Sequence, residues 1–105
     1  MRVLFDHGTP DPLRRHLTNH VVETSAERGW SQLQNGELLD IAEQEKFDVL
    51  VTTDQKLKYQ QNLTGRSIAI VVLLSTSWPK IQLRIQDVRQ AIDDVKPGSY
   101  IEIPI

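Results

Sequence analysis

The chain has 105 residues and a mass of 12.0 kDa, so we expect a single domain over residues 1–105. Hydrophobic residues make up 39% and charged residues 25% of the chain, which excludes a disordered tail and a collagen-like protein. There is no cysteine, which excludes disulfides, thiolate nucleophiles and zinc–thiolate sites and favours a cytoplasmic protein. The longest apolar run, 68–74, is far shorter than the about 20 residues that cross a bilayer, so no membrane partner is expected.

The net charge of −2 is the sum of two opposed halves. Residues 1–54 hold ten acids and five bases, a net charge of −5, and residues 55–105 hold four acids and seven bases, a net charge of +3. This division suits an acid-lined metal site with basic flanks. It is equally compatible with ordinary solvated surface charge.

Short apolar runs alternate with helical segments along the first half of the chain. Arg2–Phe5 predicts a strand, followed by a helix that reaches about Leu17 and is capped by Thr9 or Asp11. The next expected elements are a strand at 20–24, a short helical or irregular piece at 25–30, a helix at 36–46 capped by Asn35, and a strand at 48–52.

The second half continues the alternation. A helix is expected at 54–63, and 67–74 is a strand that is apolar on both faces, as a strand covered by helices on both sides should be. A long helix capped by Thr76 or Ser77 follows, and Tyr100–Ile103 is a last strand that Pro104 limits to an edge of the sheet. The apolar face of the long helix is formed by Ile81, Ile85, Val88, Ile92 and Val95.

This alternation predicts an α/β domain, a three-layer α/β/α sandwich around a mainly parallel sheet of about five strands. We expect the strand order 2-1-3-4-5 and right-handed crossovers. The direction of the last strand stays open at this stage.

Functional sites of open α/β sheets lie beyond the carboxyl ends of the strands, where the strand order reverses. Asp6 follows the first strand, Asp54 follows the third, and Glu37 lies in the first turn of the helix that feeds the third strand. Converging carboxylates suit an oxygen-ligated Mg²⁺ or Mn²⁺, which can activate water and hold a phosphate. Any metal here must be bound without sulfur ligands.

Each of these acids also has a purely structural interpretation. Asp6 could cap the turn that follows it, Asp54 could be the N-cap of its helix, and Glu37 could simply favour the positive end of a helix dipole. Asp40 is a rival for the position of Glu37.

Cations and aromatic residues near these acids suit a nucleic acid. Arg14 and Lys56 fall nearest the acidic corner and could contact phosphates. Trp30, Tyr59 and Trp78 could stack on bases or serve as ordinary packing residues. A receiver-like phosphoacceptor, with Asp54 as acceptor, Ser75 or Thr76 nearby and Lys96–Pro97 as the basic element, is a weaker alternative because the first strand lacks an adjacent acid pair.

Three segments resemble the PIN-like family of small bacterial proteins, relatives of VapC-type toxin ribonucleases. They are VLFDHG at 3–8, NGELLDIA at 35–42 and VLVTTD at 49–54. The family opens with an apolar strand ending D-E-N and has a later strand ending T-x-D-x-D-F. Here His7 and Gly8 replace the Glu and Asn of the first motif, and Lys56 and Leu57 replace the last acid and the aromatic residue of the second.

The resemblance implies a PIN-like fold with Asp6, Glu37 and Asp54 as metal-binding and catalytic residues, Mg²⁺ or Mn²⁺ as cofactor, and hydrolysis of RNA. It further implies the toxin component of a toxin–antitoxin pair, with a cognate antitoxin as partner. The alternative is a catalytically degraded PIN-like module that binds protein or RNA, because Lys56 stands where the family has an acid. A homodimer through the last strand or the amphipathic last helix is a further expectation.

Overall fold

A computed structural model describes all residues, 1–105, and contains one five-stranded sheet. All four strand pairs are parallel, and the strand order is β2-β1-β3-β4-β5. The strands are β1 (Arg2–Phe5), β2 (Val21–Thr24), β3 (Val49–Thr52), β4 (Ala69–Leu73) and β5 (Tyr100–Ile103). The predicted order is confirmed, and β5 is an edge strand that runs parallel to β4.

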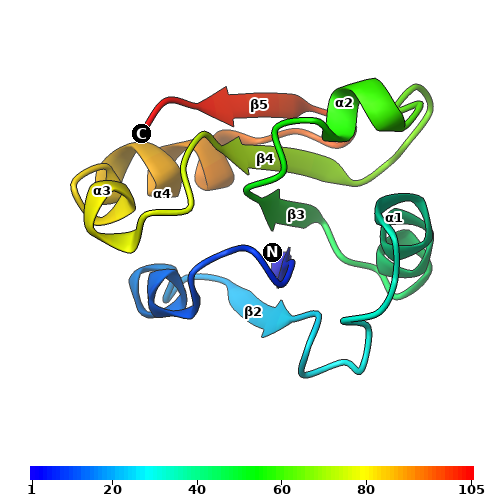
Figure 1. Ribbon diagram of the computed structural model, residues 1–105, viewed down its shortest axis with the longest axis horizontal. Coiled ribbons are helices and arrows are strands. Elements are labelled where there is room, and N and C mark those ends of the chain that lie inside the picture. Colours follow the sequence, from blue (N-terminus) through cyan, green and yellow to red (C-terminus); the bar gives the residue numbers. More distant parts are fainter.

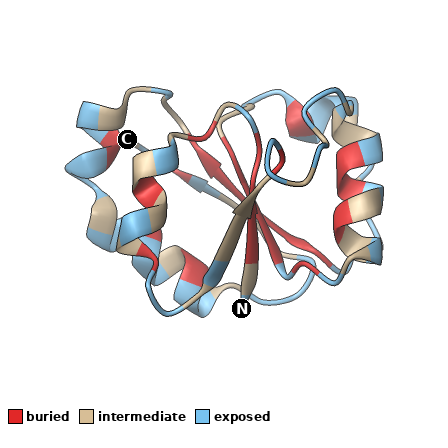
Figure 2. Ribbon diagram, turned by 90° about the horizontal axis from the view of Figure 1, so that it is seen from below, coloured by how far each residue is buried: buried red, intermediate tan, exposed pale blue.

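Helices cover both faces of this sheet, so the predicted three-layer sandwich is confirmed (Figures 1 and 2). One face packs against η1, α3 and α4, and the other packs against α1 and α2. The helices are the 3₁₀ helix η1 (Asp11–His16) and the α-helices α1 (Asn35–Gln44), α2 (Leu57–Gln60), α3 (Trp78–Gln82) and α4 (Ile85–Asp94). None of these helices is long and apolar enough to span a bilayer.

Two cores follow from the alternation of side chains along the strands. Val3 and Phe5 of β1 point to the face covered by η1 and α4, whereas Leu4 points to the face covered by α1. β3 and β4 are buried at every position, which is the burial expected of strands with helices on both sides.

The connection from β4 to β5 departs from the expected handedness. η1 leads from β1 to β2 on one face, and α1 and α2 lead in the opposite direction across the sheet on the other face, so these three connections share one hand. α3 and α4 also lead toward β5 but lie on the face of η1, and this crossover therefore has the opposite hand (Figure 1). The prediction that every crossover is right-handed is therefore wrong for the β4–β5 connection. Its helices lie on the face of η1 because the apolar side of α4 covers the part of that face that the short η1 leaves open.

Helix lengths and caps differ from the predictions in four places. The long last helix is broken into α3 and α4 at Leu83 and Arg84, and the helix predicted over 54–63 is reduced to the four residues of α2. Ser77 is confirmed as an N-cap, since its side chain accepts a hydrogen bond from the backbone N–H of Lys80. η1 and α1 begin without a side-chain cap.

The apolar face of α4 is part of the core and is not available to a second copy of the chain. Val88 and Ile92 are fully buried against the sheet, whereas Leu83, at the break before α4, is 85% exposed.

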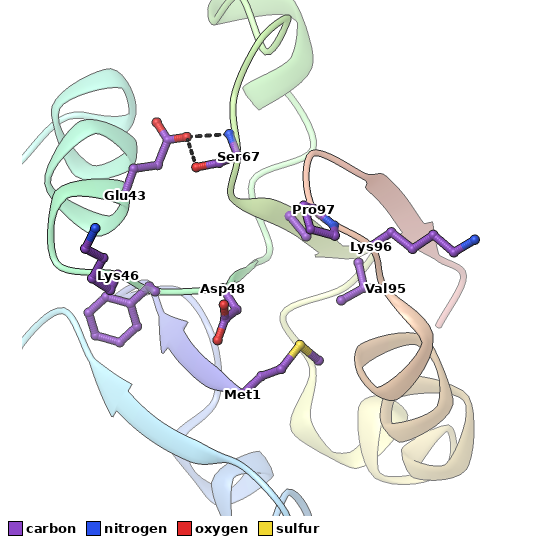
Figure 3. Close-up of a pocket in the computed structure, with 10 residues that line it drawn as sticks. Met1, Glu43, Lys46, Asp48, Ser67, Val95, Lys96 and Pro97 are labelled. Carbon is purple, nitrogen blue, oxygen red and sulfur yellow. Dashed lines mark hydrogen bonds between the residues drawn. The ribbon is translucent and has the colours of Figure 1, made fainter.

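Glu43 ties the carboxyl end of α1 to the start of β4 (Figure 3). Its carboxylate accepts hydrogen bonds from the backbone N–H and hydroxyl of Ser67, from the N–H of Ile68 and from the guanidinium of Arg66. Burial raises the pKa of Glu43, but the hydrogen bonds from Arg66, Ser67 and Ile68 outweigh burial and lower it below its ordinary value of 4.5.

Replacing Ile92 by Ala should cost about 2–5 kcal/mol of unfolding free energy, because it leaves a cavity under α4. Leu83→Ala is the matched control and should change stability by less than about 0.5 kcal/mol, since Leu83 already faces solvent. Urea unfolding of both variants measures the two values. Equal losses would show that α4 does not pack as described.

The hydrogen bonds of Glu43 should make the free energy of unfolding decrease as the pH is lowered. A carboxyl whose pKa is lower in the folded state stabilises the protein above its unfolded pKa, near 4.5, and this stabilisation is lost as the pH falls toward the folded value. Glu43→Gln should therefore cost about 1–3 kcal/mol at neutral pH, and the difference from wild type should shrink below about pH 4. Glu37→Gln is the control, because the side chain of Glu37 is exposed and makes no hydrogen bond. A Glu43→Gln deficit independent of pH would contradict this assignment.

Candidate functional site

The carboxyl ends of β1 and β3 form the corner in which the candidate residues gather. Phe5 pairs with Val51 in the parallel register, and the backbone N–H of Asp6 donates to the carbonyl of Val51 at 3.2 Å. Asp6 is therefore the first residue beyond β1, beside Thr52 at the end of β3. The chain leaves β1 toward one face and β3 toward the other, so this corner lies where the strand order reverses.

Asp6 is a buried carboxylate, only 8% exposed, and the chain supplies its hydrogen-bond donors. Oδ1 accepts from the backbone N–H of Gly8 at 3.1 Å and from the hydroxyl of Thr9 at 2.9 Å, and Oδ2 accepts from the hydroxyl of Thr52. A buried charge requires such partners. The capping role that the sequence left open for Asp6 is thus real, and Thr9 serves this turn, where it had been expected to cap η1.

Gly8 allows the loop after β1 to approach β3 closely. A β-carbon at this position would lie 2.7 Å from the hydroxyl oxygen of Thr53, closer than side chains tolerate. The same hydroxyl donates to the carbonyl of Gly8 at 3.2 Å. Gly8 therefore lets the loop lie against the end of β3, where the Thr53 hydroxyl binds its backbone carbonyl.

Thr52 connects the two candidate acids. Its hydroxyl donates its single proton to Asp6 and accepts a hydrogen bond from the backbone N–H of Asp54 at 3.0 Å. Thr52 is only 1% exposed, so it is a positioning residue beneath the site. No role was predicted for Thr52 from the sequence. It could have been noticed as the one polar residue of the buried strand Val49–Thr52.

Asp54 is half-buried and faces two further partners. Oδ1 accepts from the backbone N–H of Lys56 at 2.9 Å, and Oδ2 accepts from the side-chain amide of Asn35 at 2.7 Å. The first bond forms an Asx-type turn ahead of α2, so Asp54 does not cap a long helix. The side chain of Lys56 is exposed and makes no hydrogen bond or ion pair.

The start of α1 reaches this corner through Asn35. Its amide donates to Asp54 and, at 3.5 Å, to Gln60, so Asn35 links α1 to the α2 turn and does not cap α1. Glu37 lies in the first turn of α1, exposed and without an intramolecular partner. Its rival Asp40 forms an ion pair with Arg66 at 2.6 Å.

A metal ion can be tested against these donors. No group of three or more acidic or histidine side chains is arranged to hold one. Asp6 and Asp54 remain as a pair joined through Thr52, and the lone pairs they do not use are hard oxygen donors. Mg²⁺ is commonly held by one or two carboxylates together with water and substrate phosphates, so the pair fits an ion completed by a substrate.

The two predicted phosphate contacts differ in their surroundings. Arg14 pairs with Glu27 at 2.6 Å and donates to the carbonyl of Val22, so it joins η1 to the region around β2. The hydrogen bond from Arg14 lowers the pKa of Glu27 to about 2. Lys56 is the unpaired cation beside the corner. His7 is exposed and has no polar partner.

A hollow of about 320 Å³ lies at the opposite, amino-terminal end of the sheet (Figure 3). Glu43, which lines it, is already saturated by Ser67, Ile68 and Arg66. Lys96 and Pro97 also line it. They precede β5, so they stand at the far end of the sheet from Asp54 and cannot supply the basic element of a receiver-like site. That alternative is wrong.

The corner thus holds two carboxylates, Asp6 and Asp54, linked through Thr52, with the unpaired side chain of Lys56 beside them. Trp30 packs on Phe47 and under Arg28, whereas Tyr59, in α2 just beyond the corner, is 79% exposed. In comparisons with known proteins, no family model, no curated protein and no solved structure matches this chain.

Proposed function

We propose that this chain is a PIN-like, Mg²⁺- or Mn²⁺-dependent ribonuclease, the toxin component of a toxin–antitoxin pair that acts in the cytoplasm. The observation that supports the proposal is the linkage of Asp6 and Asp54 through the Thr52 hydroxyl at the reversal point of the strand order. An acid pair held there by buried hydrogen bonds is an oxygen site of fixed geometry.

In this proposal each residue has a defined task. Asp6 and Asp54 hold the ion, which when bound would activate water and polarise the phosphodiester. Thr52 and Asn35 orient the two carboxylates. Glu37 stands exposed at the start of α1, where it can meet a water ligand or the substrate, and Lys56 contacts a neighbouring phosphate.

A metal titration tests the ion site. An ion present at one hundred times its Kd stabilises a protein by about 2.7 kcal/mol, and each ~1 kcal/mol raises the Tm of a domain of this size by about 4 °C or more. Mn²⁺ at 10 mM should therefore raise the Tm of wild type by several degrees. Asp54→Asn should abolish the shift.

The matched control is Asp94→Asn, which removes an exposed acid at the end of α4. This variant should keep the full Mn²⁺ shift. An unchanged wild-type Tm at 10 mM Mn²⁺, or equal shifts in both variants, would contradict the metal site.

A catalytically degraded PIN-like module that binds RNA or protein is the second candidate. Asp6 already accepts three hydrogen bonds from its own chain, and the exposed Lys56 brings a positive charge to the place where the family has an acid. A cation next to the acid pair weakens the attraction of a divalent ion.

The variant Lys56→Asp separates the two candidates. If the protein is a nuclease, wild type already cleaves a fluorogenic single-stranded RNA in the presence of Mn²⁺. Lys56→Asp then only changes the rate of that cleavage. The degraded module predicts no cleavage by wild type. Cleavage that appears only in Lys56→Asp would therefore contradict the nuclease proposal for the natural chain. Lys96→Asp, at the opposite, amino-terminal end of the sheet, controls for the change in net charge.

A further inference from the structure

Three adjoining hollows form a groove along the outer side of α4, next to the end of η1. They have volumes of about 550, 290 and 10 Å³, and Arg89 is the one residue that lines all three. His16, at the end of η1, lines two of them. In Figure 1, η1 is the blue coil below α3 and α4, so the groove runs on this side of the sandwich.

The cations of this groove are free to meet a ligand. Arg89 is exposed and makes no hydrogen bond or ion pair within the chain. Arg84 approaches Asp87 only at 3.6 Å, and both side chains are more than half exposed, a contact that contributes little. An unpaired guanidinium in a hollow is a ready donor for a phosphate, to which it can bind with two parallel hydrogen bonds.

Two acids, Asp87 and Asp93, also line the groove. Asp93 lies 2.7 Å from Nε2 of His20, whose side chain is 8% exposed. Asp87 remains close to Arg84 alone. Two arginines and two aspartates therefore line the groove, and Arg89 is the one among them without an ion pair or hydrogen-bond partner, so the attraction for a phosphate depends on Arg89 and not on a net positive charge.

Neutral hydrogen-bonding groups accompany these cations. Gln82, Gln86 and Gln90 follow one another at steps of four residues and all line the groove. Side-chain amides both donate and accept, so they suit the edges of unpaired bases. Ten residues of α-helix extend about 15 Å, enough for two or three nucleotides of an extended strand.

An aromatic pair lies at the groove, on the segments that follow β1 and β4. His16 stacks against Trp78 at the start of α3, with ring centroids 5.8 Å apart. α3 follows the carboxyl end of β4, and η1 follows the loop that carries Asp6, so this ring pair belongs to the two segments that connect the carboxyl end of the sheet with the groove. Aromatic rings in such a position can stack on bases without sequence preference.

We propose that this groove binds the backbone of single-stranded RNA, with Arg89 as the central phosphate contact. The proposal rests on the proposed function for the class of ligand, but it does not depend on cleavage or on a metal. It makes α4 the surface that holds the substrate strand beyond the corner.

The test measures affinity for a fluorescent 12-nucleotide RNA by anisotropy, in EDTA and with Asp54→Asn as the background so that the RNA stays intact. Adding Arg89→Gln should weaken binding several-fold and should lower the slope of log K against log salt by about 0.7, the value for one lost phosphate contact on a single strand. Lys96→Gln, an exposed lysine before β5, is the matched control and should change neither quantity.

Three results would overturn the groove proposal: no RNA binding by the background protein, equal effects of the two variants, or binding of poly-glutamate that depends on Arg89 when RNA binding does not. The last result would assign the groove to an acidic protein segment. RNA binding that depends on Arg89 in a protein whose Tm does not respond to Mn²⁺ would retain the groove and reject the nuclease. A Tm that rises with Mn²⁺, together with RNA binding that does not depend on Arg89, would retain the metal site and reject the groove.

Discussion

The structure depends on one constraint, the burial of the Asp6 carboxylate at the end of a central strand. A charge in this position must find donors inside the protein, and it takes them from two segments of chain, the Gly8–Thr9 loop and Thr52 at the end of β3. The hydroxyl of Thr52 in turn accepts a hydrogen bond from the backbone N–H of Asp54. Those bonds set the path of the loop toward η1 and the turn toward α2. The corner is consequently rigid because the fold requires it, and any chemistry there uses groups that the fold has already positioned.

The second determinant is how the two faces of the sheet are covered. α1 and α2 occupy one face, and their connection through Asn35, Asp54 and Gln60 closes that side of the corner. The other face has only the six residues of η1 until α3 and α4 return to it, with a crossover of the opposite hand. Where η1 and α4 meet they leave the groove around Arg89. Both candidate sites therefore arise from the way the layers close over a fully buried sheet.

The strands were predictable from sequence because their apolar runs, such as Ala69–Leu73, are buried on both faces and have only one sensible placement. The break between α3 and α4 was not, because Ile81 and Ile85 continue one apolar stripe across it. Nothing local in the sequence marks that α2 ends after one turn. The predicted strand order was enough to place Asp6 and Asp54 at neighbouring strand ends. The side-chain contacts of Asn35 and Thr52 depend in addition on strand register and rotamers, which no sequence pattern encodes. For the same reason Arg14, near the corner in sequence, is paired with Glu27.

The opposed charges of the two halves of the chain now have a spatial meaning. The acidic half supplies Asp6 and Asp54 of the corner, which repel a phosphate unless a cation is bound, and the basic half supplies the groove with Arg84 and Arg89 beside Asp87 and Asp93. The groove cations lie along α4 and make no ion pair or hydrogen bond with Asp6 or Asp54. They therefore do not neutralise the acids of the corner in place of a metal ion. The groove can therefore contribute only by holding the same strand through direct contact, which is why affinity for RNA and response to Mn²⁺ are separable properties of this fold.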